Sequence, residues 1–158
     1  MKTAEEKVTT MNDKAYVSLI GRLLIGLIFV MSGIHKIADP QGTQQYMAAM
    51  GITTGTTFLY AGAVFMEVVG GLSLWLGVWS KWGATALIIF MMPTTMIFHT
   101  NFDDQNQTIH FLKNLAMMGG LLYVAVYGPG RLSIDRGVSR VNQDVESEVP
   151  SLKKVVHQ

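Results

Sequence analysis

Residues 16–38 of the chain read YVSLIGRLLIGLIFVMSGIHKIA, an apolar run in which Arg22 is the one charged residue before the closing His35 and Lys36. A helix needs about 20 mostly apolar residues to cross a hydrocarbon core about 30 Å thick, and this run is long enough. It is longer than the apolar part of a signal peptide, and no A-x-A-like site follows it. The run therefore predicts a retained transmembrane helix.

Three further segments have the same character, at about 57–79, 82–99 and 109–127. The chain of 158 residues is 49% hydrophobic and only 15% charged, and its apolar residues come in long blocks rather than in the short periodic runs of a water-soluble core. The sequence therefore predicts an all-α fold. We expect residues 16–137 to form an integral membrane four-helix bundle that has lipid as its surroundings.

Charge and cysteine content exclude several classes of function. The formal net charge is +1, so no overall field favours nucleic acid as a partner. Cysteine is absent, which excludes disulfide exchange and thiolate metal sites.

Lysine and arginine are distributed unevenly among the segments that flank the expected helices. The connections at residues 39–57 and 100–108 contain neither. The basic residues outside the membrane segments are Lys2, Lys7, Lys14, Lys81, Arg131, Arg136, Arg140, Lys153 and Lys154. Because cytoplasmic flanks carry the excess of basic residues, both termini are predicted to be cytoplasmic. Residues 1–15 are expected to form an N-terminal tail, and the polar, aperiodic residues 138–158 a flexible C-terminal tail.

Charged and small residues recur along three of the expected helices with helical spacing. Intervals of three and four residues place the members of each set on one helix face, and small residues let helices approach closely in lipid. The three sets are Arg22, Gly26, Phe29, Gly33 and Lys36; Ala63, Glu67, Gly70, Leu74 and Gly77; and Lys113, Ala116, Gly120, Tyr123 and Tyr127. We expect these sets to be the inward faces of the bundle.

Arg22 and Glu67 are charged residues inside the apolar segments. At a rise of 1.5 Å per residue, their depths in the membrane differ by less than about 10 Å, which a long arginine side chain can span. We therefore predict an Arg22–Glu67 pair. Such a pair either fixes helix packing alone or belongs to a central cavity in which Glu67 handles protons or binds a ligand.

A second polar cluster is expected at the outer ends of the helices. It comprises His35, Lys36, Asp39, His99, Asn101, Asp103, Asp104, His110, Lys113 and Asn114. Their spacing matches no metal-ligand motif, so no metal site is predicted. One interpretation is a polar mouth for a small molecule, lined by His35, Lys36, His99 and Lys113. The other is a set of solvated helix ends.

Several of these motifs together resemble the DoxX family of small membrane proteins. They are Arg22-x3-Gly26-x2-Phe29-x3-Gly33-x2-Lys36, Glu67-x2-Gly70-Gly71-Leu72 followed by Gly77, His99, Lys113-Asn114-Leu115, Gly119-Gly120-Leu121-Leu122, and the closing Gly128-Pro129-Gly130-Arg131-Leu132-Ser133-Ile134-Asp135. The resemblance spans roughly residues 16–137 and rests on the order and spacing of the motifs.

The resemblance implies a four-helix protein of the bacterial inner membrane. Some relatives are subunits of a thiosulfate:quinone oxidoreductase, others are linked to resistance against quinones, catechols or oxidative stress, and some associate with soluble redox enzymes. It therefore implies quinone as a possible cofactor and a soluble redox protein as a possible partner, and leaves open whether the chain is itself an enzyme.

Three functions are compatible with these observations. The first is a redox-linked subunit that binds quinone or a related small aromatic, with electrons supplied by a partner. The second is a non-catalytic scaffold that recruits a soluble protein through its basic tail. The third is a small-molecule transporter, which would need a homo-oligomer because four short helices enclose little space. The candidate ligand-binding or buried polar residues are Arg22, Glu67, His35, Lys36, His99, Lys113 and Asn114.

Overall fold

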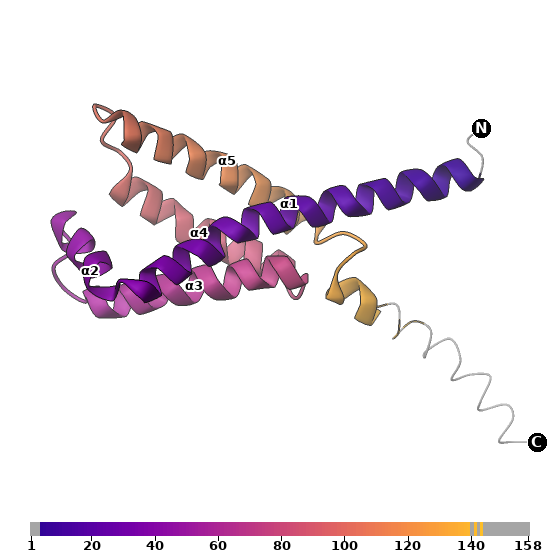
Figure 1. The fold of residues 1–158 in the computed structure, drawn as a ribbon, viewed down its shortest axis with the longest axis horizontal. Coiled ribbons are helices and arrows are strands. Elements are labelled where there is room, and N and C mark those ends of the chain that lie inside the picture. Colours follow the sequence, from indigo (N-terminus) through magenta and orange to yellow (C-terminus); the bar gives the residue numbers. More distant parts are fainter. Residues whose placement is uncertain (1–3, 140, 142, 144–158) are drawn as a thin grey trace, which may run out of the picture.

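The computed structural model describes residues 4–139, 141 and 143, and within them the chain is helical apart from short connections. Its helices are α1 (Ala4–Ala38), α2 (Pro40–Ala49), α3 (Thr56–Leu76), α4 (Ser80–Phe98) and α5 (Gln105–Tyr127), drawn in Figure 1. Residues 134–139 add a short helical segment after α5. The described residues contain no β-strand, which confirms the predicted all-α fold.

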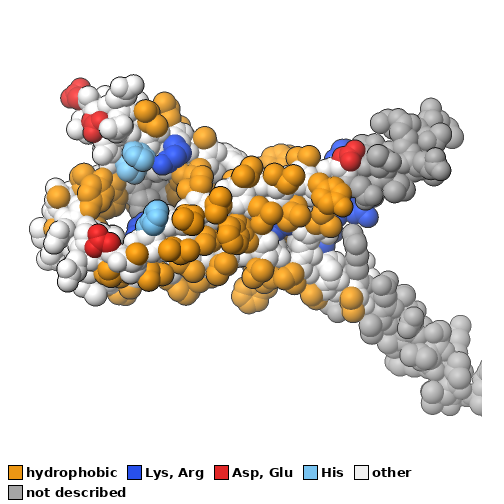
Figure 2. All heavy atoms as spheres, in the orientation of Figure 1, with side chains coloured by type: hydrophobic (Ala, Val, Ile, Leu, Met, Phe, Trp, Pro, Cys, Tyr) orange, Lys and Arg blue, Asp and Glu red, His pale blue; other side chains and the backbone are white. Residues whose placement is uncertain are grey.

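Four of these helices are long and apolar enough to span a membrane. The spans are Asp13–Ala38, Thr56–Leu76, Ser80–Phe98 and Gln105–Tyr127. Figure 2 shows hydrophobic side chains over the middle of the visible face and charged side chains near its two ends. This distribution matches an apolar band between two polar surfaces, and the prediction of four spanning helices is confirmed.

Two segments differ from the predicted boundaries. Helix α1 begins at Ala4 rather than near residue 16. The stretch 39–57, expected to be a connecting loop, contains α2. Asp39 caps α2 by accepting a hydrogen bond from the Gly42 amide at 2.9 Å, and Pro40 occupies the first helical position, where it needs no donor. The flexible tail predicted for 138–158 falls mostly outside the described residues.

Helices α1 and α3 form the most extensive contact of the fold, followed by α4 with α5 and α3 with α4. The α1–α3 contact is close because glycines meet there: a Cβ added to Gly26 would lie 2.9 Å from the Gly71 carbonyl oxygen. The inward faces predicted for these two helices are confirmed. Their members are buried, except that Lys36 is partly exposed.

The inward face predicted for the last helix is wrong for four of its five members, since only Gly120 is half-buried, against Ile25 of α1. Lys113, Ala116, Tyr123 and Tyr127 are exposed, and the last two pack their rings together on the outside with centroids 4.5 Å apart. The face of α5 that turns inward consists of Asn114, Met117, Leu121 and Val124. It lies one residue further along, a rotation of about 100°. Long apolar side chains fill the interior here, whereas lysine and tyrosine lie where they can reach the interface.

The core lies near the middle of the four spanning helices. It comprises Phe29, Leu74, Ala84, Leu87, Met91, Met117, Leu121 and Val124. Beyond it, α4 and α5 separate from α1 and α3 toward the end that carries α2 (Figure 1). The start of α1 and residues 134–139 both lie at the opposite end, as an even number of spans requires. That this end is cytoplasmic remains a prediction from the basic residues.

Candidate ligand-binding site

A cavity of about 750 Å³ opens where the helices separate. Figure 2 shows a hollow at this end of the molecule, with histidine and lysine side chains at its rim. All five helices contribute to its lining, which is mostly apolar. The volume falls in the range of about 300–1,000 Å³ that is usual for small-molecule sites.

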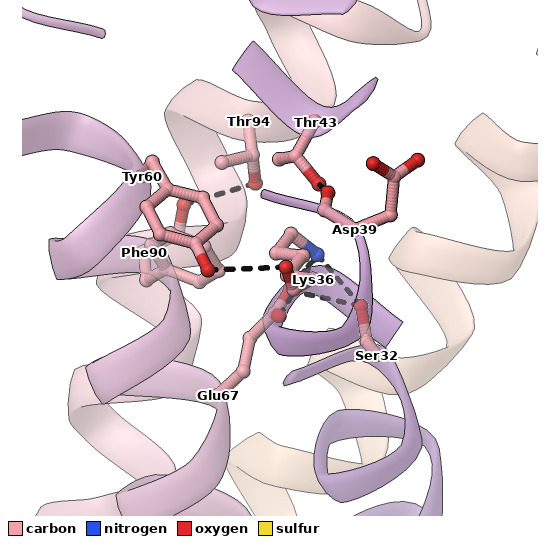
Figure 3. Close-up of polar contacts among 8 residues, drawn as sticks. All are labelled: Ser32, Lys36, Asp39, Thr43, Tyr60, Glu67, Phe90 and Thr94. Carbon is pink, nitrogen blue, oxygen red and sulfur yellow. Dashed lines mark hydrogen bonds and ion pairs between the residues drawn. The ribbon is translucent and has the colours of Figure 1, made fainter. Parts of the chain in front are cut away.

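The buried polar group of this cavity is a lysine–glutamate pair contributed by α1 and α3 (Figure 3). The Lys36 ammonium lies 2.9 Å from Glu67 Oε1 and 2.8 Å from Oε2, and it also donates to the Ser32 hydroxyl at 2.8 Å. Ser32 donates in turn to Glu67 Oε1 at 3.1 Å. The Glu67 side chain is only 8% exposed, so its charge is neutralised by a cation from the neighbouring helix rather than by water.

The pair is held in register by contacts on both sides. Tyr60 of α3 donates its hydroxyl to the Lys36 carbonyl at 3.0 Å, which satisfies an acceptor in the last turn of α1 (Figure 3). One turn earlier, Gly33 faces Val68, and a Cβ at Gly33 would lie 2.6 Å from the valine methyl. The close approach of the two backbones therefore brings Lys36 alongside Glu67.

Two histidines stack near the mouth of the cavity, and both line it. The ring centroids of His99 and His110 are 5.1 Å apart. His110 Nδ1 lies 2.9 Å from the Lys113 ammonium. Because an ammonium can only donate, this Nδ1 accepts and the ring proton is on Nε2. His99 Nδ1 lies 2.8 Å from Gln107 Oε1, so that ring donates from Nδ1. The described residues contain no group of three or more His, Asp and Glu arranged to hold a metal ion.

Asn114 links the cavity wall to α4. Its side-chain amide donates to the Thr95 hydroxyl at 3.0 Å, and Thr95 is 2% exposed. His35 and Asp39 complete the polar rim at the end of α1. The rim therefore carries several hydrogen-bonding side chains, and Asp39, His99, His110, Lys113 and Asn114 all have partners within the protein.

Helix α2 covers one side of the cavity. Tyr46 stacks on Phe98 of α4 with ring centroids 5.6 Å apart, and Met47 is 7% exposed. Phe29 and Phe90 add further aromatic surface to the lining. These side chains make the walls suited to a flat apolar molecule.

The predicted Arg22–Glu67 pair is wrong. Arg22 donates to the Leu74 carbonyl at 2.7 Å and to the Leu132 carbonyl, and it is 1% exposed. Leu74 lies about 10 Å beyond Glu67 along α3, at 1.5 Å per residue. Because α1 and α3 run antiparallel with Gly26 against Gly71, Arg22 faces the end of α3 and Lys36 reaches Glu67.

Arg22 belongs to the closed end of the bundle. Ser18 donates to the Pro129 carbonyl at 3.1 Å. Asp135 accepts a hydrogen bond from the Trp79 amide at 3.0 Å, and its own amide donates to the Gly77 carbonyl at 3.0 Å. The segment 128–135 therefore packs over the turn between α3 and α4, and Arg22 connects α1 and α3 to it.

The structure brings six of the seven predicted site residues around one cavity and leaves Arg22 outside it. The six are Glu67, His35, Lys36, His99, Lys113 and Asn114. Their role in binding remains a prediction. Sequence reasoning missed Ser32, Tyr60 and the contribution of α2. Ser32 had a detectable signal, since it precedes Lys36 by four residues and thus shares its helix face.

Comparison with known proteins gives a consistent result. The family model for DoxX matches residues 17–100. The chain is 37% identical over 118 residues to the inner membrane protein YqjF of Escherichia coli, covering 75% of the chain and 88% of the relative. It is 33% identical over 123 residues to the inner membrane protein YphA of the same organism, covering 75% and 87%. An uncharacterized membrane protein of Mycobacterium tuberculosis is 29% identical over 131 residues, covering 75% and 79%. No solved structure matches.

Proposed function

Since the chain belongs to the DoxX family and is a multi-pass protein of the bacterial inner membrane, we propose that it binds a quinone or a related small aromatic molecule in the cavity that Glu67 lines. In this proposal the protein is a membrane subunit of a redox reaction. The observation that carries this proposal is the cavity itself, which combines aromatic walls with one buried charged pair and a polar rim.

The shape and lining of the cavity suit a flat ring with oxygen substituents. Phe29, Phe90 and Phe98 offer apolar surface for the ring. The Lys36–Glu67 pair and the histidines of the rim offer hydrogen-bonding groups to its oxygens.

The redox reaction needs an electron source outside this chain. The sequence has no cysteine that could carry a redox-active disulfide. We therefore propose that a soluble redox protein or a diffusible donor supplies the electrons, and that the basic residues at the Arg22 end of the bundle face this partner.

The packing beyond the cavity favours binding over transport. Leu74, Leu87 and Leu121 are each 0% exposed and lie in the core between the cavity and the Arg22 end. A solute that enters the cavity therefore meets close-packed side chains rather than a continuation of the path.

Filling the cavity tests the proposal. Thr94 lines it, and Thr94→Phe places a ring in the space. The matched control is Thr85→Phe, because Thr85 is also on α4, is half-buried, and bonds to the carbonyl four residues back, as Thr94 does, but lies outside the cavity lining. We expect decylubiquinone at 100 times its Kd to stabilise the wild type and the control by about 2.7 kcal/mol in mild detergent. Thr94→Phe should lose this stabilisation.

Equal stabilisation of all three proteins would place the ligand elsewhere. No stabilisation of the wild type by decylubiquinone or by its reduced form would contradict the proposed function.

A further inference from the structure

A second hollow lies at the closed end of the bundle, away from the cavity that Glu67 lines. It is a groove of about 330 Å³ between the turn that joins α3 to α4, the end of α5 and the residues that follow α5. Membrane spans end at Leu76, begin at Ser80 and end at Tyr127. The groove therefore lies at the depth where the hydrocarbon core gives way to the lipid headgroups.

Aromatic side chains of the groove are exposed at the surface of the protein. Trp79 is 74% exposed, Trp82 77% and Tyr127 68%, and all three line the groove. Indole and phenol rings are enriched at membrane–water interfaces, because they combine an apolar ring with a polar tip. The walls of the groove are thus suited to contact with lipid.

Trp79 is held in a conformation that is unfavourable for a large side chain. Its φ is +49°, the one positive value outside glycine among the described residues. Such a conformation persists only where the surroundings impose it. Here the Trp79 amide donates to Asp135 Oδ1 at 3.0 Å, which ties the turn between α3 and α4 to the segment after α5. The two sides of the groove are therefore fixed relative to each other.

The charged side chains of the groove sum to one positive charge. They are the cations Lys81 and Arg136 and the carboxylate Asp135. Asp135 accepts hydrogen bonds from the amides of Trp79 at 3.0 Å and Ser80 at 3.4 Å, so it is engaged by the start of α4. Neither cation forms an ion pair with a carboxylate of the described residues. Lys81 donates to a backbone carbonyl at 3.0 Å and keeps further hydrogens to donate, and Arg136 is exposed.

We propose that this groove binds the headgroup of an anionic phospholipid, with Lys81 and Arg136 donating to its phosphate. Basic pockets between membrane helices are suited to such headgroups. A zwitterionic lipid brings a cation of its own, which gains nothing from a groove with an excess of positive charge. The exposed aromatic rings favour a lipid over a soluble anion, because they lie where lipid is concentrated. This inference does not depend on what the Glu67 cavity binds.

The test uses the tryptophan fluorescence of the full chain in vesicles of brominated lipid. Bromine on the acyl chains quenches tryptophans that it contacts, and Trp82→Phe supplies the signal of the other two tryptophans for subtraction. Quenching at varied lipid ratios gives the relative binding constants of brominated phosphatidylglycerol and phosphatidylcholine. An excess of one positive charge predicts that the wild type binds phosphatidylglycerol about fivefold more tightly.

Two double variants that lose the same charge separate the groove from the overall field. Lys81→Gln with Arg136→Gln removes both cations of the groove, and the preference should fall to about one. Lys14→Gln with Arg131→Gln removes two exposed cations at the same end that lie outside the groove lining, and the preference should stay at about fivefold. If the first double variant does not fold, Arg136→Gln alone should still lower the preference toward one.

Equal binding of the two lipids by the wild type would overturn the proposal and leave these cations to a soluble partner. An equal loss of preference in both double variants would also contradict it, because the overall field would then be the cause. Glycerol 3-phosphate at the concentration of the lipid should leave the quenching unchanged. If it restores the fluorescence, the groove takes a soluble phosphate and the assignment to a lipid is wrong.

Discussion

Two cations on the same face of α1 are accommodated in different ways. Lys36 meets a carboxylate, Glu67, and forms a buried ion pair at the cavity. Arg22 meets two backbone carbonyls, those of Leu74 and Leu132. A guanidinium presents donors in a fixed planar fork and can bridge two acceptors, whereas an ammonium is a compact point charge. The side-chain chemistry thus suits Arg22 to connecting segments and Lys36 to pairing with charge.

This difference predicts that Arg22→Lys is not conservative. The shorter side chain can reach at most one of the two carbonyls, so the other loses its donor, at a cost of about 1–3 kcal/mol. Arg131→Lys is the control, because Arg131 is exposed, and it should change stability by less than about 0.5 kcal/mol. Thermal unfolding in mild detergent measures both, and an equal effect of the two variants would contradict the bridging role of Arg22.

At the scale of the elements, the contact between α1 and α3 sets the geometry of the site. Its glycines bring the backbones together, and Trp75 adds a hydrogen bond from its indole N–H to the Leu23 carbonyl at 2.9 Å. The register that follows places Lys36 beside Glu67 and Arg22 beside Leu74. A change at the glycine contact is therefore expected to disturb both ends of the bundle.

The contact can be tested by adding a single methyl group. A Cβ at Gly71 would lie 2.8 Å from a Val30 methyl and 3.0 Å from the Gly26 carbonyl oxygen, so Gly71→Ala should separate the helices and destabilise the fold by about 1–3 kcal/mol. Gly62 is on the same helix with nothing within 4 Å of its Cβ position. Gly62→Ala should be neutral or stabilising by up to about 1 kcal/mol, because alanine favours helix. If Gly62→Ala destabilised the fold by the same amount, the effect of Gly71→Ala could not be assigned to the close contact between α1 and α3.

The elements also show where local patterns mislead. Helix α5 carries two candidate stripes one residue apart, and in the one with lysine and tyrosines Ala116, Tyr123 and Tyr127 face outward, while Lys113 lines the cavity. Helix α2 was missed because it is too short to span a membrane, although Asp39-Pro40 is a typical helix start. Both outcomes depend on neighbours: α5 is rotated by its packing on α4, and Met47 and Tyr46 of α2 pack against the bundle.

At the scale of the whole molecule, the two ends differ in construction. One end is closed by the segment 128–135 and Arg22, and the other opens into the cavity beneath α2. The distribution of basic residues predicts that the closed end faces the cytoplasm and that the cavity opens at the outer side of the inner membrane.

Cysteine labelling tests this orientation, because the chain contains no cysteine of its own. Gln45 of α2 and Gly137 are both exposed, and Gly137 has open space around its Cβ position. In intact cells, a membrane-impermeant maleimide should label Gln45→Cys almost completely and Gly137→Cys only at background level. After permeabilisation, both should react. The reverse pattern in intact cells would invert the topology.

The sequence by itself determined the number of spanning helices, the all-α fold and the inward faces of α1 and α3. These depend on apolar length and on the positions of charge and glycine along a helix, which are local properties set by the thickness and polarity of the bilayer. Only the tertiary structure decided that Lys36 rather than Arg22 pairs with Glu67, which face of α5 turns inward, and that six polar residues from α1, α3, α5 and the C-cap of α4 surround one cavity. Pairing across helices depends on register and rotation, and these follow from where the backbones meet at Gly26 and Gly71, a contact between residues far apart in the chain.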